Sequence, residues 1–123
     1  KPAKWSTGNY GWSSARTEEN VIQWVGVKLG APHTVREVRL YPRDDEGNVG
    51  AGFPVDYHIE VSMDGLHWQT VDEVKDRTEV DRVQVATFPP AQAKLVRVVG
   101  TRLKPNPADQ RYTMQLVELE IYE

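Results

Sequence analysis

Three polar stretches hold most of the side chains that could do chemistry in this 123-residue chain: residues 5–20, 43–52 and 102–112. An aromatic ring can pack against the apolar C–H face of a pyranose, and a planar guanidinium or a carboxylate can hold neighbouring hydroxyls in a fork. The three stretches supply these groups, so sugar recognition is the chemistry that they favour. The side chains concerned are Trp5, Tyr10, Trp12, Arg16, Arg43, Asp44, Asp45, Asn48, Asn106, Gln110, Arg111 and Tyr112.

Catalysis has little support in the sequence. His33, His58 and His67 are scattered and do not have the spacing of metal ligands. No nucleophile elbow, phosphate loop or zinc-protease motif is present. The chain has no cysteine, which excludes a thiol nucleophile, a disulfide and a cysteine-ligated zinc site. We therefore predict that the domain is not an enzyme.

The charge balance argues against two classes of partner. Fifteen basic residues and eighteen acidic residues give a net charge of −3. Nucleic acids and anionic membranes both need a concentrated basic surface, so neither is an expected partner. No apolar run has the length of a transmembrane helix, and 39% hydrophobic residues are ordinary for one globular domain.

Alternating side chains predict a strand over residues 56–62. Tyr57, Ile59 and Val61 share one face there, and the polar side chains share the other. The Asp64-Gly65 pair that follows is typical of a tight hairpin turn, because it supplies a position with positive φ.

Similar short apolar runs are spaced along the chain, and no helical period persists for ten residues. Pro89-Pro90 is expected to end one strand, and residues 1–20, rich in glycine and hydroxyls, are predicted to be loop. In the last strand Val117, Leu119 and Ile121 are expected to face inward. This pattern predicts an all-β antiparallel sandwich. The further predicted strands are residues 21–29, 35–41, 69–74, 82–88, 94–100 and 114–122.

Several segments, taken in order, resemble one family. They are residues 24–30 (WVGVKLG), 41–43 (YPR), 52–54 (GFP), 56–62 (DYHIEVS), 64–68 (DGLHW), 94–98 (KLVRV) and 115–122 (QLVELEIY). Together they resemble the discoidin family, also called coagulation factor type C domains, and its bacterial relatives, the family 32 carbohydrate-binding modules. The resemblance covers nearly the whole chain.

This resemblance implies a discoidin-type jelly roll, similar to galactose-binding domains, of about eight strands. Residues 1–123 would form a single domain of a larger protein that is secreted, periplasmic or at the cell surface. Many vertebrate members have a disulfide that joins their ends, so the absence of cysteine favours a bacterial module. The first strand of the family would lie upstream of residue 1, and the exposed sheet edge would favour pairing with a second chain.

The resemblance also implies site residues. In galactose-binding members the arginine of the Tyr-Pro-Arg segment contacts sugar hydroxyls, and it corresponds to Arg43. Those members often have a histidine near the position of Thr7, where this chain departs from the pattern. An aromatic residue of the last long loop often stacks on the sugar, and Tyr112 is the nearest candidate. Two alternatives stay open: Arg43 could pair with acidic residues and only hold its own loop, and Tyr112 could pack inward.

The remaining aromatic residues are divided between site and core. Tyr10 and Trp12 lie in a polar, glycine-containing stretch, so we expect exposed rings that contribute to ligand binding, together with Asp45. Trp5 and Trp24 are expected to fill the core instead.

Structural calcium is a further expectation of the resemblance. Many members bind it through oxygens of an upstream loop and a glutamate of the closing strand, which is Glu118 here. Calcium needs about six to eight oxygen ligands, and Glu118 alone supplies too few. The Asp-Gly turn that precedes the family's first loop is absent from this sequence.

The leading functional hypothesis is a non-catalytic carbohydrate-binding module that tethers a larger glycan-active or surface protein to its glycan, with a galactose-type sugar as one candidate that the missing histidine near Thr7 disfavours. Two alternatives come from other classes. One is an adhesion domain that binds protein or phospholipid, as in the animal branch of the family. Residues 49–53 are only mildly apolar and lie beside three acidic residues, which disfavours lipid. The other alternative is a structural spacer.

Overall fold

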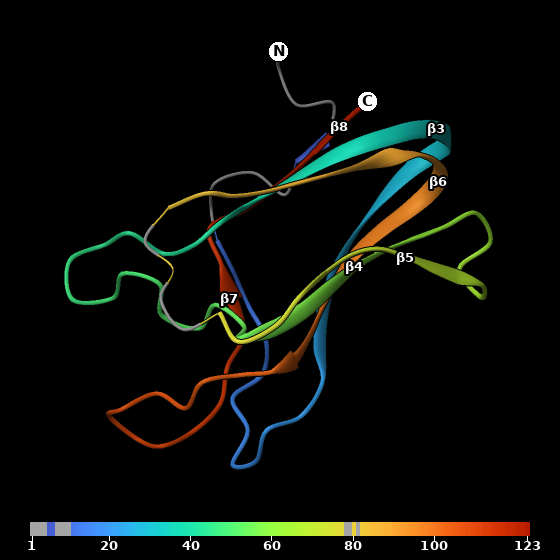
Figure 1. Cartoon of the computed structure of the whole chain (residues 1–123). Helices are drawn as coiled ribbons and strands as arrows, with labels where there is room; N and C mark the ends of the chain where they lie inside the picture. The colour runs from blue at the N-terminus through green and yellow to red at the C-terminus, as the bar shows by residue number, and fades with distance from the viewer. Residues whose placement is uncertain (1–4, 7–10, 78–79, 81) are drawn as a thin grey trace.

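The computed structural model describes residues 5–6, 11–77, 80 and 82–123, and the regular elements found in these ranges are all β-strands (Figure 1). Within these ranges no helix is long and apolar enough to cross a membrane. The strands are β1 (Trp5–Ser6), β2 (Trp12–Ser13), β3 (Gln23–Tyr41), β4 (Asp56–Ser62), β5 (Trp68–Val74), β6 (Gln84–Arg102), β7 (Gln115–Leu116) and β8 (Glu118–Tyr122).

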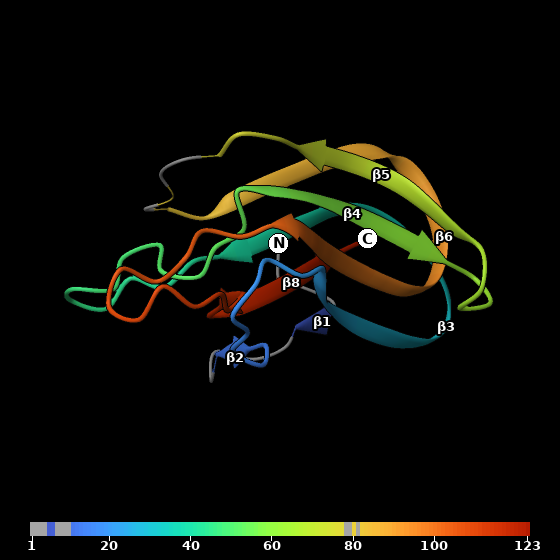
Figure 2. The same cartoon turned by 90° about the horizontal axis from the view of Figure 1, so that it is seen from below.

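Two long strands, β3 and β6, organise the sandwich. The main sheet has the order β1-β8-β3-β6-β4-β5, and β2 pairs with β7 in a second sheet. The pairing of β3 with β6 shifts register between Lys28 and His33, and Figures 1 and 2 show both strands curving back on themselves. The two halves of the main sheet therefore face each other, with β4 and β5 in one layer and β8 and β1 in the other. The predicted all-β antiparallel sandwich is confirmed.

The strand boundaries differ from the predicted ones because the long strands bend instead of ending. The predicted strands over residues 21–29 and 35–41 are the two ends of β3, and those over residues 82–88 and 94–100 belong to β6. Pro89-Pro90 does not end β6. Residues 88–90 lie opposite Arg36 alone, between the Glu37–Thr87 and Val35–Ala91 pairs, so the missing N–H groups remove no ladder bond.

The predicted loop over residues 1–20 contains two short strands. Trp5 pairs with Ile121 and Trp12 with Leu116, so both strands depend on partners near the other end of the chain. The composition of a segment gives no information about pairing partners that lie so far away in sequence. The predicted closing strand is also divided at Val117. This side chain was expected to face the core, but it is only half-buried and lies between the two short strands. Its N–H donates to the carbonyl oxygen of Tyr41 at 2.8 Å, between the end of β7 and the start of β8.

The core lies between the two layers and follows the predicted alternation. Tyr57, Ile59 and Val61 of β4 are at most 3% exposed, while the polar side chains between them are half-buried on the other face. Leu119 and Ile121 are fully buried, as expected. Other fully or nearly fully buried side chains are Val35, Val38, Leu40, Ala93, Val96, Val98 and Met114.

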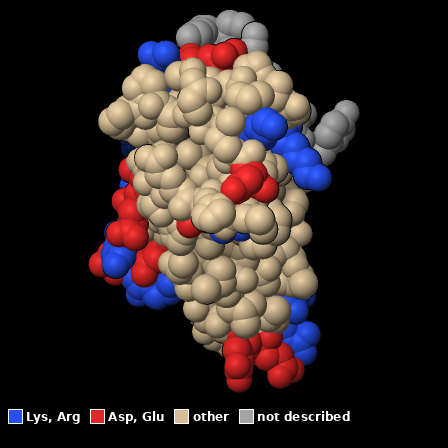
Figure 3. All heavy atoms as spheres, turned by 90° about the vertical axis from the view of Figure 1, so that its right-hand side faces the viewer, with Lys and Arg blue, Asp and Glu red and all other residues tan. Residues whose placement is uncertain are grey.

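Trp24 corrects one expectation, because it lies outside the core. Its side chain is 56% exposed, whereas Val25 beside it is 8% exposed. Successive strand residues point to opposite faces, so burying Val25 and Leu29 directs Trp24 outward. Figure 3 shows the side of the molecule at which β3 and β6 bend: charged side chains lie at its left margin, its lower end, its top and its upper right, and the rest of this face is mostly uncharged. The side chain of Trp5 lies outside the described part of the structure.

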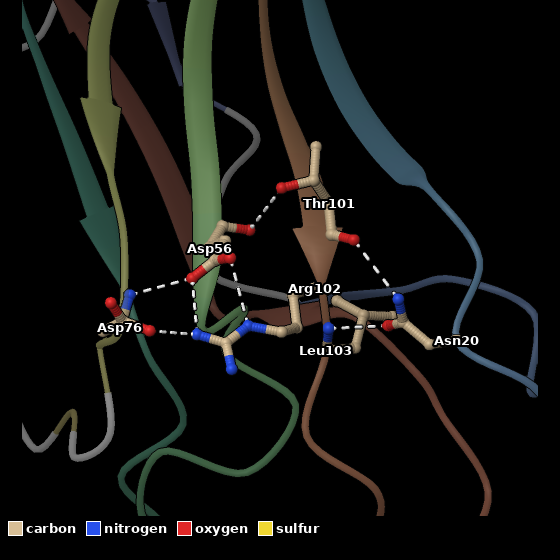
Figure 4. Close-up of polar contacts among 6 residues, drawn as sticks. All are labelled: Asn20, Asp56, Asp76, Thr101, Arg102 and Leu103. Carbon is tan, nitrogen blue, oxygen red and sulfur yellow. Dashed lines mark hydrogen bonds and ion pairs between the residues drawn. The ribbon is translucent and has the colours of Figure 1, made fainter.

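A polar network ties together the segments from which the long loops leave (Figure 4). Arg102, at the end of β6, donates from Nε and Nη2 to the two carboxylate oxygens of Asp56 at 3.0 and 2.9 Å, and its Nη2 also pairs with Asp76. This pairing lowers the pKa of Asp56. Asn20 joins the network by donating to the carbonyl oxygen of Thr101 at 3.2 Å. This network therefore holds in place the residues from which the loops next to β4 and β6 begin.

Candidate functional site

Arg43 follows β3 directly and lies at the centre of the site. Its Nε and Nη2 donate to the two carboxylate oxygens of Asp45 at 3.0 and 2.7 Å. Its Nη1 donates to Oε1 of Gln115 at 3.2 Å. A guanidinium has five N–H donors, so two remain without a partner in the part of the chain that the structure describes. The side chain is 30% exposed, so a ligand can reach these donors.

Asp45 holds Arg43 from within the same loop. Besides Arg43, it accepts a hydrogen bond from Nδ2 of Asn48 at 2.8 Å. The Arg43 guanidinium, and after it Asn48, lower the pKa of Asp45 from 3.8 to about 2. The carboxylate is therefore ionised at neutral pH, and the pair keeps a fixed geometry.

Two glycines shape this loop where it approaches other segments. Gly50 has φ of 72°, its N–H donates to the carbonyl oxygen of Arg43 at 2.7 Å, and a Cβ atom at this position would lie 2.3 Å from the carbonyl oxygen of Val80. Gly52 has φ of 76°, and a Cβ there would lie 2.7 Å from the side chain of Gln115. Only glycine satisfies both the positive φ and the close approach.

A small hollow of about 350 Å³ opens beside Arg43. Gln115 crosses it, because its side chain accepts from Arg43 and donates to Oγ of Ser13 at 3.1 Å. Trp12 is half-buried, packs against the core and also lines the hollow. The arrangement places a planar cation, an amide, a hydroxyl and an aromatic ring around one opening. The lining residues are Gly11, Trp12, Ser13, Arg43, Asp45, Gln115, Leu116 and Val117.

A larger hollow of about 1030 Å³ adjoins the first, since Arg43 and Gln115 line both. Its other walls come from residues 47–55, from the segment between β5 and β6, and from residues 104–107. These segments extend from one end of the sandwich in Figure 1. The two hollows together could receive more than one sugar unit.

The structure brings only some of the predicted site residues together. Arg43, Asp45 and Trp12 come together at the small hollow. Thr7 and Tyr10 lie outside the described residues. Tyr112 is half-buried against the core and forms a bridge with Thr17, and it is not among the residues that line either hollow.

Sequence reasoning missed Gln115 and Ser13 as site residues. Gln115 lies in a predicted strand, and nothing local distinguishes it from other strand residues. It reaches Arg43 because its N–H donates to the carbonyl oxygen of Gly52 at 2.8 Å, which joins β7 to the loop after β3. A contact across 72 positions of sequence gives no local signal.

Histidine chemistry and metal binding both lack support from the described residues that line these hollows. The three histidines pair with three different carboxylates, at Glu123, Glu60 and Asp64, and none of them is among the residues that line either hollow. Within the described residues no group of three or more His, Cys, Asp or Glu could hold a metal ion.

Calcium at Glu118 therefore stays a prediction. Glu118 lies at the start of β8 and is half-buried. Calcium takes six to eight oxygens, backbone carbonyls and waters included, and the Glu118 carboxylate would supply one or two of them. Thermal unfolding with added calcium or with a chelator tests the prediction, and a melting temperature that is the same in both would contradict it.

Known proteins share the fold and part of the sequence. The model of the F5/8 type C domain family matches residues 1–116. No curated protein matches the chain. Chitosan-binding module 1 from a chitosanase/glucanase of Paenibacillus sp. IK-5 is 33% identical, with a TM-score of 0.70 over 92% of this chain and 76% of that chain.

Two Clostridium perfringens modules share the fold at lower identity. The family 32 module of NanJ, in complex with galactose, is 22% identical, with a TM-score of 0.72 over 94% of this chain and 77% of that chain. A family 32 module in complex with GalNAc-β-1,3-galactose is 19% identical, with a TM-score of 0.73 over 94% of this chain and 76% of that chain. The family match over nearly the whole length and the 33% identical module agree with the jelly-roll architecture: the chain belongs to the family of F5/8 type C domains.

Proposed function

We propose that this domain is a non-catalytic carbohydrate-binding module whose ligand contacts the small hollow at Arg43. One observation carries the proposal: Asp45 and Gln115 fix the plane of the guanidinium through three of its N–H groups, and two N–H groups remain for a ligand. A planar donor that is held in advance suits two neighbouring hydroxyls, because little side-chain freedom is lost on binding. Trp12 supplies an aromatic surface in the same hollow.

The relatives support a glycan as the ligand. The 33% identical module is a chitosan-binding module, and two modules with the same fold are in complex with galactose or with GalNAc-β-1,3-galactose. Both hollows of this chain are open to solvent, so a sugar would bury little surface. We therefore expect dissociation constants on the order of 0.1 to 1 mM.

Among the sugars that the relatives bind, we favour galactose-type sugars over chitosan. Arg43 occupies the position that contacts sugar hydroxyls in galactose-binding members of the family. Chitosan carries ammonium groups, and no carboxylate is among the described residues that line the larger hollow. A cationic polymer would therefore meet positive charge along that wall.

The test compares two arginine variants on a glycan array and by titration calorimetry. Arg43→Ala is expected to abolish binding to the recognised sugar class. Arg111→Ala is the matched control. Arg111 belongs to the polar stretch 102–112 and pairs with Glu18 at 3.8 Å, as Arg43 pairs with Asp45, but it lines neither hollow. Circular dichroism and a thermal melt show whether each variant is folded. Unchanged binding by a folded Arg43→Ala variant would overturn the proposed site.

The same experiment separates the other functional classes. An array without any bound glycan would favour a protein partner or a spacer, and pull-down experiments would follow. Binding to anionic vesicles that falls with salt would favour a phospholipid-binding adhesion domain. We expect neither result.

We further propose that the module serves a larger secreted, periplasmic or surface protein. A weak single site contributes through effective concentration: it holds the attached protein near a polymer that presents the same sugar many times. The 33% identical module comes from a chitosanase/glucanase, which supports this role. Fusion to a glycoside hydrolase should raise activity on a polymeric substrate and leave activity on a soluble short substrate unchanged.

A further inference from the structure

Cations from four segments line the larger hollow. Arg16 comes from the segment before β3, Arg43 from the loop after β3, Arg77 and Arg82 from the segment between β5 and β6, and Lys104 from the loop after β6. No aspartate or glutamate is among the described residues that line it. The whole chain has a net charge of −3, so this concentration of positive charge is a local property of the hollow.

Two of these cations have no carboxylate partner among the described residues. Arg43 is paired with Asp45 at 2.7 Å, whereas Arg77 and Lys104 form no ion pair there. Arg77 is half-buried, so it has lost part of its hydration, and the described residues supply no carboxylate to compensate for that loss. An anion that enters the hollow would supply that compensation.

Arg77 and Lys104 each follow directly in sequence a residue of the network in Figure 4, and both line the larger hollow. Arg77 follows Asp76 in sequence, and its N–H donates to the carbonyl oxygen of Val55 at 2.9 Å. Lys104 lies two residues after Arg102, whose guanidinium pairs with Asp76. The network therefore holds the backbone near both cations, and both residues line the same hollow.

We propose that the larger hollow binds an anionic glycan, with Arg77 and Lys104 contacting the acidic groups of the sugar chain. This inference rests on the glycan-binding function proposed above and names its substrate class. Charge complementarity is the reason: a carboxylate or sulfate group on the glycan meets cations that have no carboxylate partner among the described residues, while Arg43 at the junction of the hollows contacts hydroxyls. Nucleic acid is a poorer fit, because the negative net charge of the domain opposes a long polyanion.

The test uses four soluble ligands of matched length. Oligogalacturonates carry carboxylates, sulfated galactan oligosaccharides carry sulfates, neutral galactan oligosaccharides carry neither, and chitosan oligosaccharides carry ammonium groups. We expect at least one of the two acidic ligands to bind about tenfold more tightly than the neutral one. The difference should shrink as salt rises from about 20 mM to about 300 mM. The comparison of carboxylate with sulfate identifies the acidic group.

Variants then locate the contact. Arg77→Ala and Lys104→Ala are each expected to weaken binding of the acidic ligand about three- to tenfold and to weaken binding of the neutral ligand much less. Lys94→Ala is the matched control, because Lys94 is exposed on β6 and lines neither hollow.

Three other outcomes would each overturn the inference, and each refutes a different part of it. Equal binding of acidic and neutral ligands, or tighter binding of chitosan oligosaccharides, would refute the anionic class and leave the glycan-binding module intact. An acidic preference that survives in folded Arg77→Ala and Lys104→Ala variants would refute the assigned cations. No binding of any of the four ligands, with silence on the glycan array, would refute the module and with it this inference.

Discussion

The guanidinium carbon of Arg97 lies 3.7 Å from the centroid of the Trp68 ring. The same guanidinium lies 5.6 Å from the ring of Trp24, and its Nε donates to Oε1 of Glu60 at 2.6 Å. Glu60 is 14% exposed and also pairs with His58 at 3.1 Å. These contacts therefore connect the outer faces of four neighbouring strands, β3, β6, β4 and β5.

Removing Arg97 should destabilise the domain. Arg97→Ala loses the cation–π contact with Trp68 and leaves the largely buried carboxylate of Glu60 without its guanidinium, so we expect a loss of about 2 kcal/mol in the free energy of unfolding. Arg97→Lys keeps the charge but not the planar stack, and should lose about half as much. Urea denaturation measures both, with Lys94→Ala, expected within about 0.5 kcal/mol of wild type, as the control. Equal stability of Arg97→Ala and Lys94→Ala would contradict this account.

Two glycines of the loop after β3 make a matched pair. Gly50 and Gly47 both have positive φ, but an added Cβ at Gly50 would meet the Val80 carbonyl oxygen at 2.3 Å, whereas nothing lies within 4 Å at Gly47. Gly47→Ala should therefore lose only about 1 kcal/mol, for the backbone conformation. Gly50→Ala should lose more than about 2 kcal/mol in addition, and sugar binding should weaken because Arg43 moves with its loop. Equal unfolding free energies for the two variants would show that the loop adjusts around Gly50.

Sugar binding should depend on pH through Asp45. Its folded-state pKa is about 2, below its usual value of 3.8, so its pairing with Arg43 is fully present above about pH 5 and is lost as the pH falls from about 4 toward 2. We expect the affinity for the sugar to be constant between about pH 5 and pH 8 and to fall at lower pH. Calorimetric titration across this range, with circular dichroism to confirm folding, measures the effect.

The control for this pH dependence is Asp45→Asn. The amide keeps the shape of the carboxylate but carries no charge, so it should hold Arg43 less firmly at every pH. We expect weaker binding at neutral pH and a flat profile at lower pH. A wild-type profile in the folded Asp45→Asn variant would mean that another group titrates.

Alternation along the chain was sufficient to predict the sandwich and the inward face of β4. Tyr57, Ile59 and Val61 are buried as predicted, because a strand buried on one face needs an apolar residue at every second position. The Asp64-Gly65 turn is also local. Oδ1 of Asp64 accepts from the N–H groups of Leu66 and His67, both at 2.8 Å, and Gly65 has φ of 78°.

Trp24 shows what alternation could not establish. Its type favours burial, and no single-strand pattern says which face of β3 meets the second layer. The bend in β3 and β6 decides this, since it places Val25 and Leu29 between the layers. A Cβ at Gly26 would lie 3.3 Å from the Trp24 ring, so the glycine leaves room for the indole on the outer face.

At the site, the chemistry near Arg43 follows from local sequence. A guanidinium comes after a strand, in a loop with the carboxylate that holds it, and those contacts span only two residues. The tertiary structure alone decided which distant groups join it. Gln115 reaches Arg43, and the segment of Arg77 meets that of Lys104, through pairings across the sandwich whose sequence separations leave no local pattern. Loop chemistry is therefore readable from neighbours in sequence, while the shape and charge of a hollow depend on which strand ends the fold brings together.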